Sequence, residues 1–340
     1  MNQIEKRIEF ARLAPGSIFI ETSDKTALFK YLSDQNFLLP NETIENINIP
    51  GAGNMNYVIR IVTDQRSFIL KQSRPWVEKY PMIEAPIERI LVEAEFYKSL
   101  LSNEYFQSCS PKIHIVDDKN FIIIMEDLGN VKDFSFLYHE GASITKAQIQ
   151  FLAKYLIQLH QVNTSDFPNN DKMRKLNHEH IFNIPFDADN GLDLNSIQFG
   201  LDGLAKEIIS NKQLINRIHY LGELYTSKGD TLIHGDFYPG SWMQNENFFI
   251  LDPEFCFLGP PEFDLAVACA HFKITKQPDD LIDLFLSTYT ERIHVDKSKI
   301  YSFAGVEILR RLLGIAQLPL TSTLEEKRVL IDLSKKWILS

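Results

Sequence analysis

The pattern of apolar residues changes near residue 128, and this change limits the possible folds more than any other feature of the chain. Before it, two short apolar runs, residues 57–62 (YVIRIV) and 67–71 (SFILK), flank a polar turn. Residues 113–116 and 121–125 form a second pair of the same kind. Short β-branched runs joined by polar turns predict two antiparallel hairpins.

Helical patterns replace these runs in the rest of the chain. Between the hairpins one helix is expected, over residues 88–101, with its apolar stripe formed by Ile90, Leu91, Ala94, Tyr97 and Leu101. Beyond residue 128, residues 145–148 (TKAQ) and 323–326 (TLEE) fit capping boxes that open helices. The helix expected after the first box has the apolar face Ile149, Leu152, Leu156 and Leu159, and another contains Ile300, Phe303, Ala304, Ile308, Leu309, Leu312 and Leu313.

These patterns predict an α+β fold with two lobes. The first, residues 1–128, is expected to be small and β-rich with one main helix, and the second, residues 129–340, to be larger and mostly helical. A cleft between two lobes is a usual place for a ligand.

Charge and hydropathy exclude several classes of function. The 340 residues contain 35 Lys and Arg against 45 Asp and Glu, a net charge of −10. Nonspecific binders of nucleic acid or of anionic membranes need a basic face, so neither partner is expected. Because the chain has neither an apolar run of about 20 residues nor a secretory signal at its start, a cytoplasmic location is expected.

A short glycine motif precedes the first hairpin. Gly51-Ala52-Gly53-Asn54 leads into an expected strand rather than a helix, and no third glycine follows. A dinucleotide-binding turn needs strand, glycines and helix in that order, so the motif fits better a glycine-rich loop that covers phosphates. A plain hairpin turn explains the motif equally well on its own.

A lysine and a glutamate follow at suggestive positions. Lys71 ends the strand after the glycine motif, where kinase-type lobes have a lysine that contacts phosphates. Glu93 on the next helix is the expected ion-pair partner, because Glu95 points about 200° away around the helix. Taken alone, a solvated lysine at a strand end is the simpler interpretation.

The densest signal is a pair of acidic loops. Residues 231–233 (TLI) precede a loop with His234 and Asp236, and residues 248–251 precede Asp252 and Glu254. Such carboxylates can orient an attacking hydroxyl and hold Mg²⁺. His234 is expected to orient the loop through hydrogen bonds, and in an extended segment the second pair of carboxylates would share one side. Turn and N-cap roles are the alternative.

Together these motifs resemble the aminoglycoside phosphotransferase and choline kinase superfamily, which has a protein-kinase-like fold. Within it, the chain is most similar to the methylthioribose kinases. The resemblance extends from about residue 45 to 318, in family order, over GAGNMN (51–56), LKQ (70–72), MEDL (125–128), MRKL (173–176), HGDFYPGSWM (234–243), DPEF (252–255), GP (259–260) and LRR (309–311).

The resemblance implies a role for each matching residue. It implies ATP and Mg²⁺ as cofactors and a small molecule, a sugar, as acceptor, while a homodimer is left open. Asp236 would be the catalytic aspartate, and Asp252 and Glu254 would bind the metal. The nucleotide would be contacted by Gly51, Gly53, Asn54, Lys71 with Glu93, and the backbone from Glu126 to Leu128, and the sugar by Arg310 and Arg311.

The arginine pair also has a simpler explanation. Adjacent helix positions point about 100° apart, so Arg310 and Arg311 are not both expected to face one pocket wall directly, and one of them would reach around or pair with a carboxylate. A solvated basic turn accounts for the pair as well. If the pair lines a pocket, it disfavours polycationic acceptors and suits a polyhydroxyl sugar.

The chain departs from the family pattern at three places. Ala52 replaces the acidic residue usual in methylthioribose kinases, and Ser241 stands where most of the superfamily has a metal-binding Asn. The helical stretch between about 270 and 300 is shorter than usual.

The resulting expectation is a small-molecule kinase that transfers the γ-phosphate of ATP to a sugar hydroxyl, with S-methyl-5-thioribose as the preferred acceptor. Another sugar, an amino alcohol or an antibiotic are alternatives within the superfamily. A nucleotide-binding regulator without catalysis is the alternative from another class, and a metal-dependent hydrolase would leave the glycine motif and Lys71 without a role.

Overall fold

The computed structural model describes residues 1–51, 53, 55–164 and 166–340. It divides into two compact units, Met1–Val131 and Lys132–Ser340, and each is considered by itself. No helix in the described ranges is both long and apolar enough to cross a membrane.

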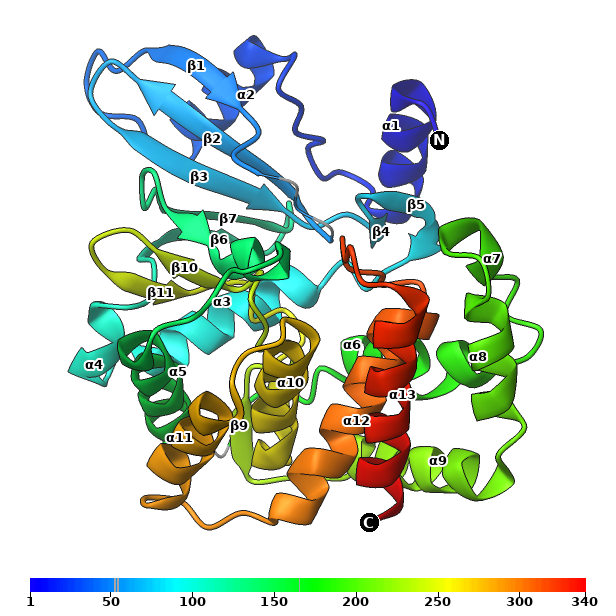
Figure 1. Ribbon diagram of the computed structural model, residues 1–340. Coiled ribbons are helices and arrows are strands. Elements are labelled where there is room, and N and C mark those ends of the chain that lie inside the picture. Colours follow the sequence, from blue (N-terminus) through cyan, green and yellow to red (C-terminus); the bar gives the residue numbers. More distant parts are fainter. Residues whose placement is uncertain (52, 54, 165) are drawn as a thin grey trace. The chain divides into compact units, whose positions relative to one another are not determined.

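The first unit is built on an antiparallel sheet in the order β1-β2-β3-β7-β6 (Figure 1). The strands of this unit are β1 (Ile44–Asn48), β2 (Tyr57–Thr63), β3 (Ser67–Gln72), β4 (Trp76–Val77), β5 (Tyr80–Glu84), β6 (Ile113–Asp117) and β7 (Ile122–Glu126). Both expected hairpins are confirmed, as the pairs β2–β3 and β6–β7.

More helices occur in this unit than the one main helix expected. They are α1 (Gln3–Leu13), α2 (Lys25–Asp34), α3 (Arg89–Leu100) and α4 (Glu104–Gln107). The main helix, α3, ends one residue earlier than expected, so Leu100 is buried and Leu101 is exposed. The stripe predicted through Leu101 is therefore wrong at its last position.

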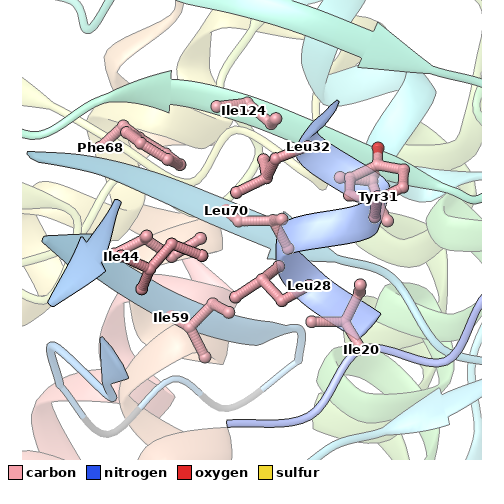
Figure 2. Close-up of a cluster of buried hydrophobic side chains, with 11 residues drawn as sticks. Ile20, Leu28, Tyr31, Leu32, Ile44, Ile59, Phe68, Leu70 and Ile124 are labelled. Carbon is pink, nitrogen blue, oxygen red and sulfur yellow. The ribbon is translucent and has the colours of Figure 1, made fainter. Parts of the chain in front are cut away.

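Helix α2 covers one face of the sheet (Figure 2). Leu28 and Leu32 of α2 pack with Ile59, Leu70 and Ile124 of the central strands, and all five are fully buried or nearly so. Because side chains alternate along a strand, burying Leu70 in this core directs Lys71 to the opposite face. The core of the first unit thus sets the direction of that lysine.

The second unit is mostly helical, with short strands that present the acidic loops. Its strands are β8 (Lys132–Asp133), β9 (Thr231–Ile233), β10 (Trp242–Gln244), β11 (Phe248–Ile250) and β12 (Phe257–Gly259). Its helices are α5 (Lys146–Leu159), α6 (Asp171–His178), α7 (Leu194–Ile197), α8 (Leu201–Ile209), α9 (Lys212–Thr226), α10 (Pro261–Ile274), α11 (Asp279–Thr290), α12 (Lys297–Leu313) and α13 (Leu324–Leu339), with the short turns η1 (Phe134–Tyr138), η2 (Glu179–Asn183) and η3 (Ile184–Phe186).

The capped helices form as expected. Thr145 with Gln148 caps α5, and Thr323 with Glu326 caps α13. Helix α12 is buried over nearly its whole surface and packs against both α10 and α13 (Figure 1). A helix that is apolar all round belongs in a core, so charged residues on the inner part of α12 must find partners within the protein.

Candidate active site

In the first unit, Lys71 and Glu93 form a buried ion pair. The Nζ of Lys71 lies 2.9 Å from Oε1 and 2.8 Å from Oε2 of Glu93, and both residues are almost inaccessible to solvent. The pairing expected from the sequence is therefore confirmed. Glu95 pairs instead with Lys98 on the outer side of α3. A buried charge pair holds its two members in fixed orientation.

The glycine motif lies in the connection between the antiparallel strands β1 and β2. The backbone N–H of Gly53 donates to the carbonyl oxygen of Gly51 at 3.0 Å, which makes a tight turn. Ala52 and Asn54 lie outside the described residues. The position between two antiparallel strands is the one expected for a loop that covers phosphates, and this role stays a prediction.

The segment after β7 is held by Arg60 of β2. Its Nη2 atom donates to Oδ1 of Asp127 at 2.9 Å and to the carbonyl oxygen of Gly129 at 2.8 Å. At the start of the segment, the backbone N–H of Glu126 donates to the carbonyl oxygen of Lys112 at 2.8 Å. The backbone from Glu126 to Leu128, expected to hold adenine, is thus fixed at both ends, and the contact with adenine stays a prediction.

In the second unit, paired strands carry the two acidic loops. Strand β9 pairs with β12, and β10 pairs with β11. Asp236 lies between β9 and β10, and Asp252 and Glu254 lie between β11 and β12. Each apolar run therefore leads into its acidic loop, as the sequence indicated.

His234 connects the two loops. Its Nε2 lies 3.0 Å from the carbonyl oxygen of Leu251, and its Nδ1 lies 3.4 Å from the backbone nitrogen of Asp236. A carbonyl accepts and an N–H donates, so the hydrogen resides on Nε2. Burial lowers the pKa of His234, while the charge of Asp264 opposes this. The expected orienting role of His234 is confirmed.

Asp264 of α10 anchors the loop before Asp236, and the sequence analysis missed it. Its carboxylate accepts the backbone N–H of His234 at 2.7 Å and that of Gly235 at 2.9 Å. Gly235 has φ +81°, and a Cβ there would lie 2.2 Å from the carbonyl oxygen of Phe255. Only glycine fits this turn. An acidic residue within an apolar helix was the signal for Asp264.

Ser241 also stabilises this loop. Its hydroxyl lies 3.0 Å from the carbonyl oxygen of Asp236 and 2.9 Å from that of Tyr238. It also accepts the backbone N–H of Tyr238 at 3.2 Å. At the position where most of the superfamily has a metal-binding Asn, this chain therefore uses a short side chain to close the loop on itself.

The segment of Asp252 and Glu254 is not extended, so the condition under which the two carboxylates would share one side is not met. Asp252 is exposed and has φ +60°, whereas Glu254 is only 6% exposed. The loop that follows Asp252 is held by the amide of Asn170, just before α6, which donates to the carbonyl oxygens of Glu254 and Cys256 at 3.0 and 2.9 Å. A left-handed aspartate of this kind is typical of functional sites.

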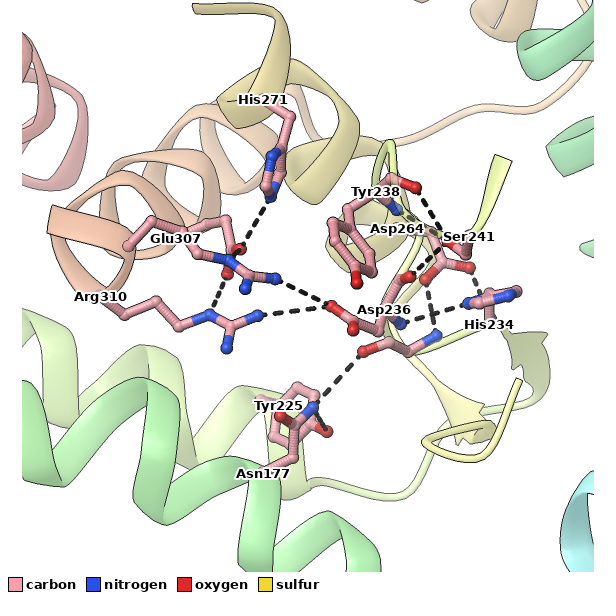
Figure 3. Close-up of polar contacts among 12 residues, drawn as sticks. Asn177, Tyr225, His234, Asp236, Tyr238, Ser241, Asp264, His271, Glu307 and Arg310 are labelled. Carbon is pink, nitrogen blue, oxygen red and sulfur yellow. Dashed lines mark hydrogen bonds and ion pairs between the residues drawn. The ribbon is translucent and has the colours of Figure 1, made fainter. Parts of the chain in front are cut away.

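Both arginines of α12 reach Asp236 (Figure 3). Nη2 of Arg310 lies 3.4 Å and Nη2 of Arg311 lies 3.3 Å from Oδ1 of Asp236. They are 5% and 7% exposed, so the solvated basic turn is excluded. At least one arginine was expected to reach around or to pair with a carboxylate, and both do so, because long side chains that diverge at the backbone converge at their guanidinium groups.

Glu307 binds the Nε atoms of both arginines, and it was also missed from the sequence. Its Oε2 accepts Nε of Arg310 at 2.5 Å, and its Oε1 accepts Nε of Arg311 at 2.8 Å. His271 of α10 lies 3.2 Å from Oε1 of Glu307 through Nε2, and its Nδ1 lies 2.7 Å from the hydroxyl of Tyr138. A glutamate within the apolar stripe of α12 was the available signal.

Opposing influences set the ionisation of these groups. Burial raises the pKa of Asp236, and the charges of Arg311 and Arg310 oppose this rise. Burial acts in the same direction on Glu307, but the two arginines and His271 outweigh it and hold the pKa of Glu307 well below its usual range. Burial lowers the pKa of His271 to about 4. Two buried guanidinium groups therefore lie between the ionised carboxylate of Glu307 and the carboxyl group of Asp236.

The residues of the second acidic loop fit Mg²⁺. Among the described residues, no group of three or more histidine, cysteine or acidic side chains is placed to hold a metal ion. Proteins that bind Mg²⁺ with nucleotides usually supply one or two carboxylates, while phosphates and water complete the octahedron. Asp252 and Glu254 provide such a pair of hard oxygen donors.

A β-sheet unit with a buried Lys–Glu pair, followed by a helical unit with two acidic loops, defines a protein-kinase-like phosphotransferase. The "Phosphotransferase enzyme family" (APH) model matches residues 46–292. The chain belongs to this family and is a kinase that phosphorylates a hydroxyl group of a small molecule, with ATP as phosphate donor.

Relatives and solved structures agree with this assignment. The chain is 27% identical to a methylthioribose kinase of Exiguobacterium sibiricum, with 82% of each chain covered, and 23% identical to that of Bacillus velezensis, with 85% of each covered. Its fold is similar to choline kinase LicA from Streptococcus pneumoniae (TM-score 0.52, 13% identity, 92% of this chain and 98% of the other). It is also similar to spectinomycin phosphotransferase APH(9)-Ia in complex with ADP and spectinomycin (TM-score 0.54, 16% identity, 92% and 98%).

Proposed function

We propose that the chain is an ATP- and Mg²⁺-dependent sugar kinase whose acceptor is S-methyl-5-thioribose. The observation that carries the proposal is the convergence of Arg310 and Arg311 on Asp236. The two buried guanidinium groups, which are hydrogen-bond donors, lie next to the carboxylate that is expected to receive the proton of the acceptor. The names of the relatives, methylthioribose kinases over most of the chain, supply the particular sugar.

Asp236 is the proposed general base. Both arginines contact Oδ1, and among the described residues no hydrogen bond is made to Oδ2. The hydroxyl oxygen of the acceptor attacks the γ-phosphorus, the bond to the leaving ADP oxygen breaks, and the hydroxyl proton passes to Oδ2. A positioned carboxylate of this kind contributes about 10²–10⁴-fold to such reactions.

Arg310 and Arg311 are the proposed contacts for the sugar. Their N–H groups are donors only, so they match hydroxyl and ring oxygens and repel ammonium groups. Asp236 and Glu307 offset the overall charge of the two arginines. The N–H groups at the ends of the guanidinium groups still carry partial positive charge. This arrangement favours a neutral polyhydroxyl acceptor over an amino alcohol or a polycationic antibiotic.

The remaining candidate residues are proposed to handle the nucleotide. Lys71, fixed by Glu93, contacts phosphate oxygens, the loop with Gly51 and Gly53 covers them, and the backbone from Glu126 to Leu128 holds adenine. Asp252 and Glu254 hold Mg²⁺, which when bound neutralises charge on the phosphates.

An acceptor panel tests the proposal. ADP release from purified protein with ATP and Mg²⁺ is measured for S-methyl-5-thioribose, ribose, choline, ethanolamine and spectinomycin, and products are identified by mass. We expect kcat/KM for methylthioribose to exceed the others at least about a hundredfold, because a site built to bind particular oxygens discriminates strongly. A better rate with choline or spectinomycin would overturn the sugar assignment while keeping the kinase.

A further inference from the structure

A buried chain of polar side chains extends from the arginine pair into the core of the second unit. It joins Tyr138 of η1, His271 of α10 and Glu307 of α12, and the last two have no exposed surface. Figure 3 shows Glu307 between His271 on one side and Arg310 on the other, and Arg311 binds the same carboxylate. Burying this many polar groups is costly unless each one is hydrogen-bonded.

The direction of each hydrogen bond in this chain is determined. The carboxylate of Glu307 only accepts, so Nε2 of His271, 3.2 Å from Oε1, carries the hydrogen. Nδ1 of a neutral His271 then accepts from the hydroxyl of Tyr138 at 2.7 Å. The low pKa of His271, about 4, is consistent with a neutral ring. Tyr138 therefore orients His271, and His271 orients Glu307.

Glu307 controls how the arginines are used. It lies three and four residues before them, so all three occupy neighbouring positions on one face of α12. Both Nε atoms donate to its oxygens at 2.5 and 2.8 Å. Because Glu307 binds the Nε atom of each arginine, the terminal Nη2 atoms of Arg310 and Arg311 are directed to Asp236.

We propose that Glu307, held by His271 and Tyr138, is the positioning residue for acceptor recognition. It converts two arginines that diverge at the backbone into one two-armed donor for the oxygens next to the reacting hydroxyl of a sugar. Glu307 itself touches no substrate. The inference rests on the proposed function only in assuming that the acceptor is bound by the arginine pair.

The first test needs no acceptor. In protein with ¹⁵N-labelled arginine, the two Nε–H signals, assigned through Arg310→Lys and Arg311→Lys, should exchange slowly with water. Glu307→Gln should lose this protection and His271→Leu should weaken it, because each removes a partner that fixes the geometry. Signals that stay protected in Glu307→Gln would overturn the proposal, whether or not the protein phosphorylates methylthioribose.

The second test separates positioning from folding by steady-state kinetics. Glu307→Gln should raise the KM for the acceptor or lower kcat/KM for the acceptor about 10- to 100-fold, because charge-assisted hydrogen bonds are lost. The KM for ATP should change less than about twofold. His271→Gln, whose amide can still donate to Glu307, should keep most of the activity that His271→Leu loses. Glu262→Gln is the matched control, a buried glutamate of α10 that accepts the backbone N–H of Asp296 instead.

Each kinetic outcome decides a different point. If Glu307→Gln lowered kcat/KM equally for ATP and for the acceptor, the residue would act only in folding. Equal activity in His271→Gln and His271→Leu would mean the same for His271, and either result would contradict the proposal. If the wild-type protein does not use methylthioribose, the proposed acceptor is wrong, and the NMR test still decides the role of Glu307.

Discussion

At the scale of single residues, the protonation of Asp236 is set by burial, which raises its pKa, and by Arg311 and Arg310, which lower it. The base must be unprotonated, so activity is lost as pH falls through this pKa. Arg311→Met removes a lowering charge, and the acid limb of the kcat/KM profile should therefore move to higher pH. The profile is measured with saturating ATP.

Arg217→Met, on α9, is the control for the loss of a positive charge in the same unit, because Arg217 contacts the carbonyl oxygen of Ile338 rather than Asp236. Its acid limb should coincide with that of the wild type. An unmoved or downward-shifted limb in Arg311→Met would show that the arginine does not stabilise the ionised base.

Sequence predicted single residues well where they belong to a motif whose pattern indicates a role. The Lys71–Glu93 pair and the orienting role of His234 are examples. Asp264 was missed because its partners, the backbone N–H groups of His234 and Gly235, lie about 30 residues away in a loop. Glu307 was missed although Arg310 and Arg311 follow it by three and four residues, because the burial of this part of α12 decides whether the three side chains pair or are solvated. A charge inside an apolar helix, as at Glu307, indicates a buried partner but does not say which one.

At the scale of elements, helix α6 acts as a support for both acidic loops. Asn170 before its start binds the carbonyls of Glu254 and Cys256, and Asn177 near its end lies 3.4 Å from the carbonyl oxygen of Gly235. Asn170→Ala should release the second loop only. The Mg²⁺ concentration for half-maximal rate should rise about threefold to tenfold, since the two hydrogen bonds that hold this loop are lost, while the acceptor KM is unchanged.

Asn183→Ala is the control, because the amide of Asn183 contacts the side chain of Glu179 within η2 and not the loops. The Mg²⁺ dependence of that variant should match the wild type. If Asn170→Ala lowered the melting temperature but left the Mg²⁺ concentration for half-maximal rate unchanged, α6 would not support the second acidic loop in the way proposed.

Elements with local signals, the hairpins and the capped helices α5 and α13, were predictable from the sequence. Helices α1 and α2 were not predicted, although Asn2 and Asp24 provide N-caps for them. The turn at Asp252 was missed, and the loop that follows it is held by Asn170, far away in the sequence. Tertiary hydrogen bonds override local extended preference at this point.

At the scale of the whole molecule, the residues proposed to contact the nucleotide directly belong to the first unit and those proposed to contact the acceptor belong to the second, so the two roles should be separable. A ligand at a hundred times its Kd stabilises by about 2.7 kcal/mol. ATP with Mg²⁺ should therefore raise the melting temperature of the wild type and of Arg310→Met, but much less that of Lys71→Met. Lys30→Met, an exposed lysine paired with Asp34 on α2, is the control.

If ATP with Mg²⁺ raised the melting temperature of Lys71→Met as much as that of the wild type, Lys71 would not be a contact for the nucleotide.

The division of the chain into a β-rich and a helical part was predictable, because hydrophobic periodicity is a local property. The contacts of α12 with α10, which create the arginine site, were not, because they depend on packing between segments distant in the sequence.

The most direct measurement of the central claim compares ADP release by the wild type and Asp236→Asn with ATP, Mg²⁺ and S-methyl-5-thioribose. Asparagine keeps the shape of the side chain but cannot accept the proton, so kcat should fall about 10²–10⁴-fold. Binding of ATP should persist, as shown by thermal shift. Turnover by Asp236→Asn close to the wild-type rate would contradict the assignment of Asp236 as the catalytic base.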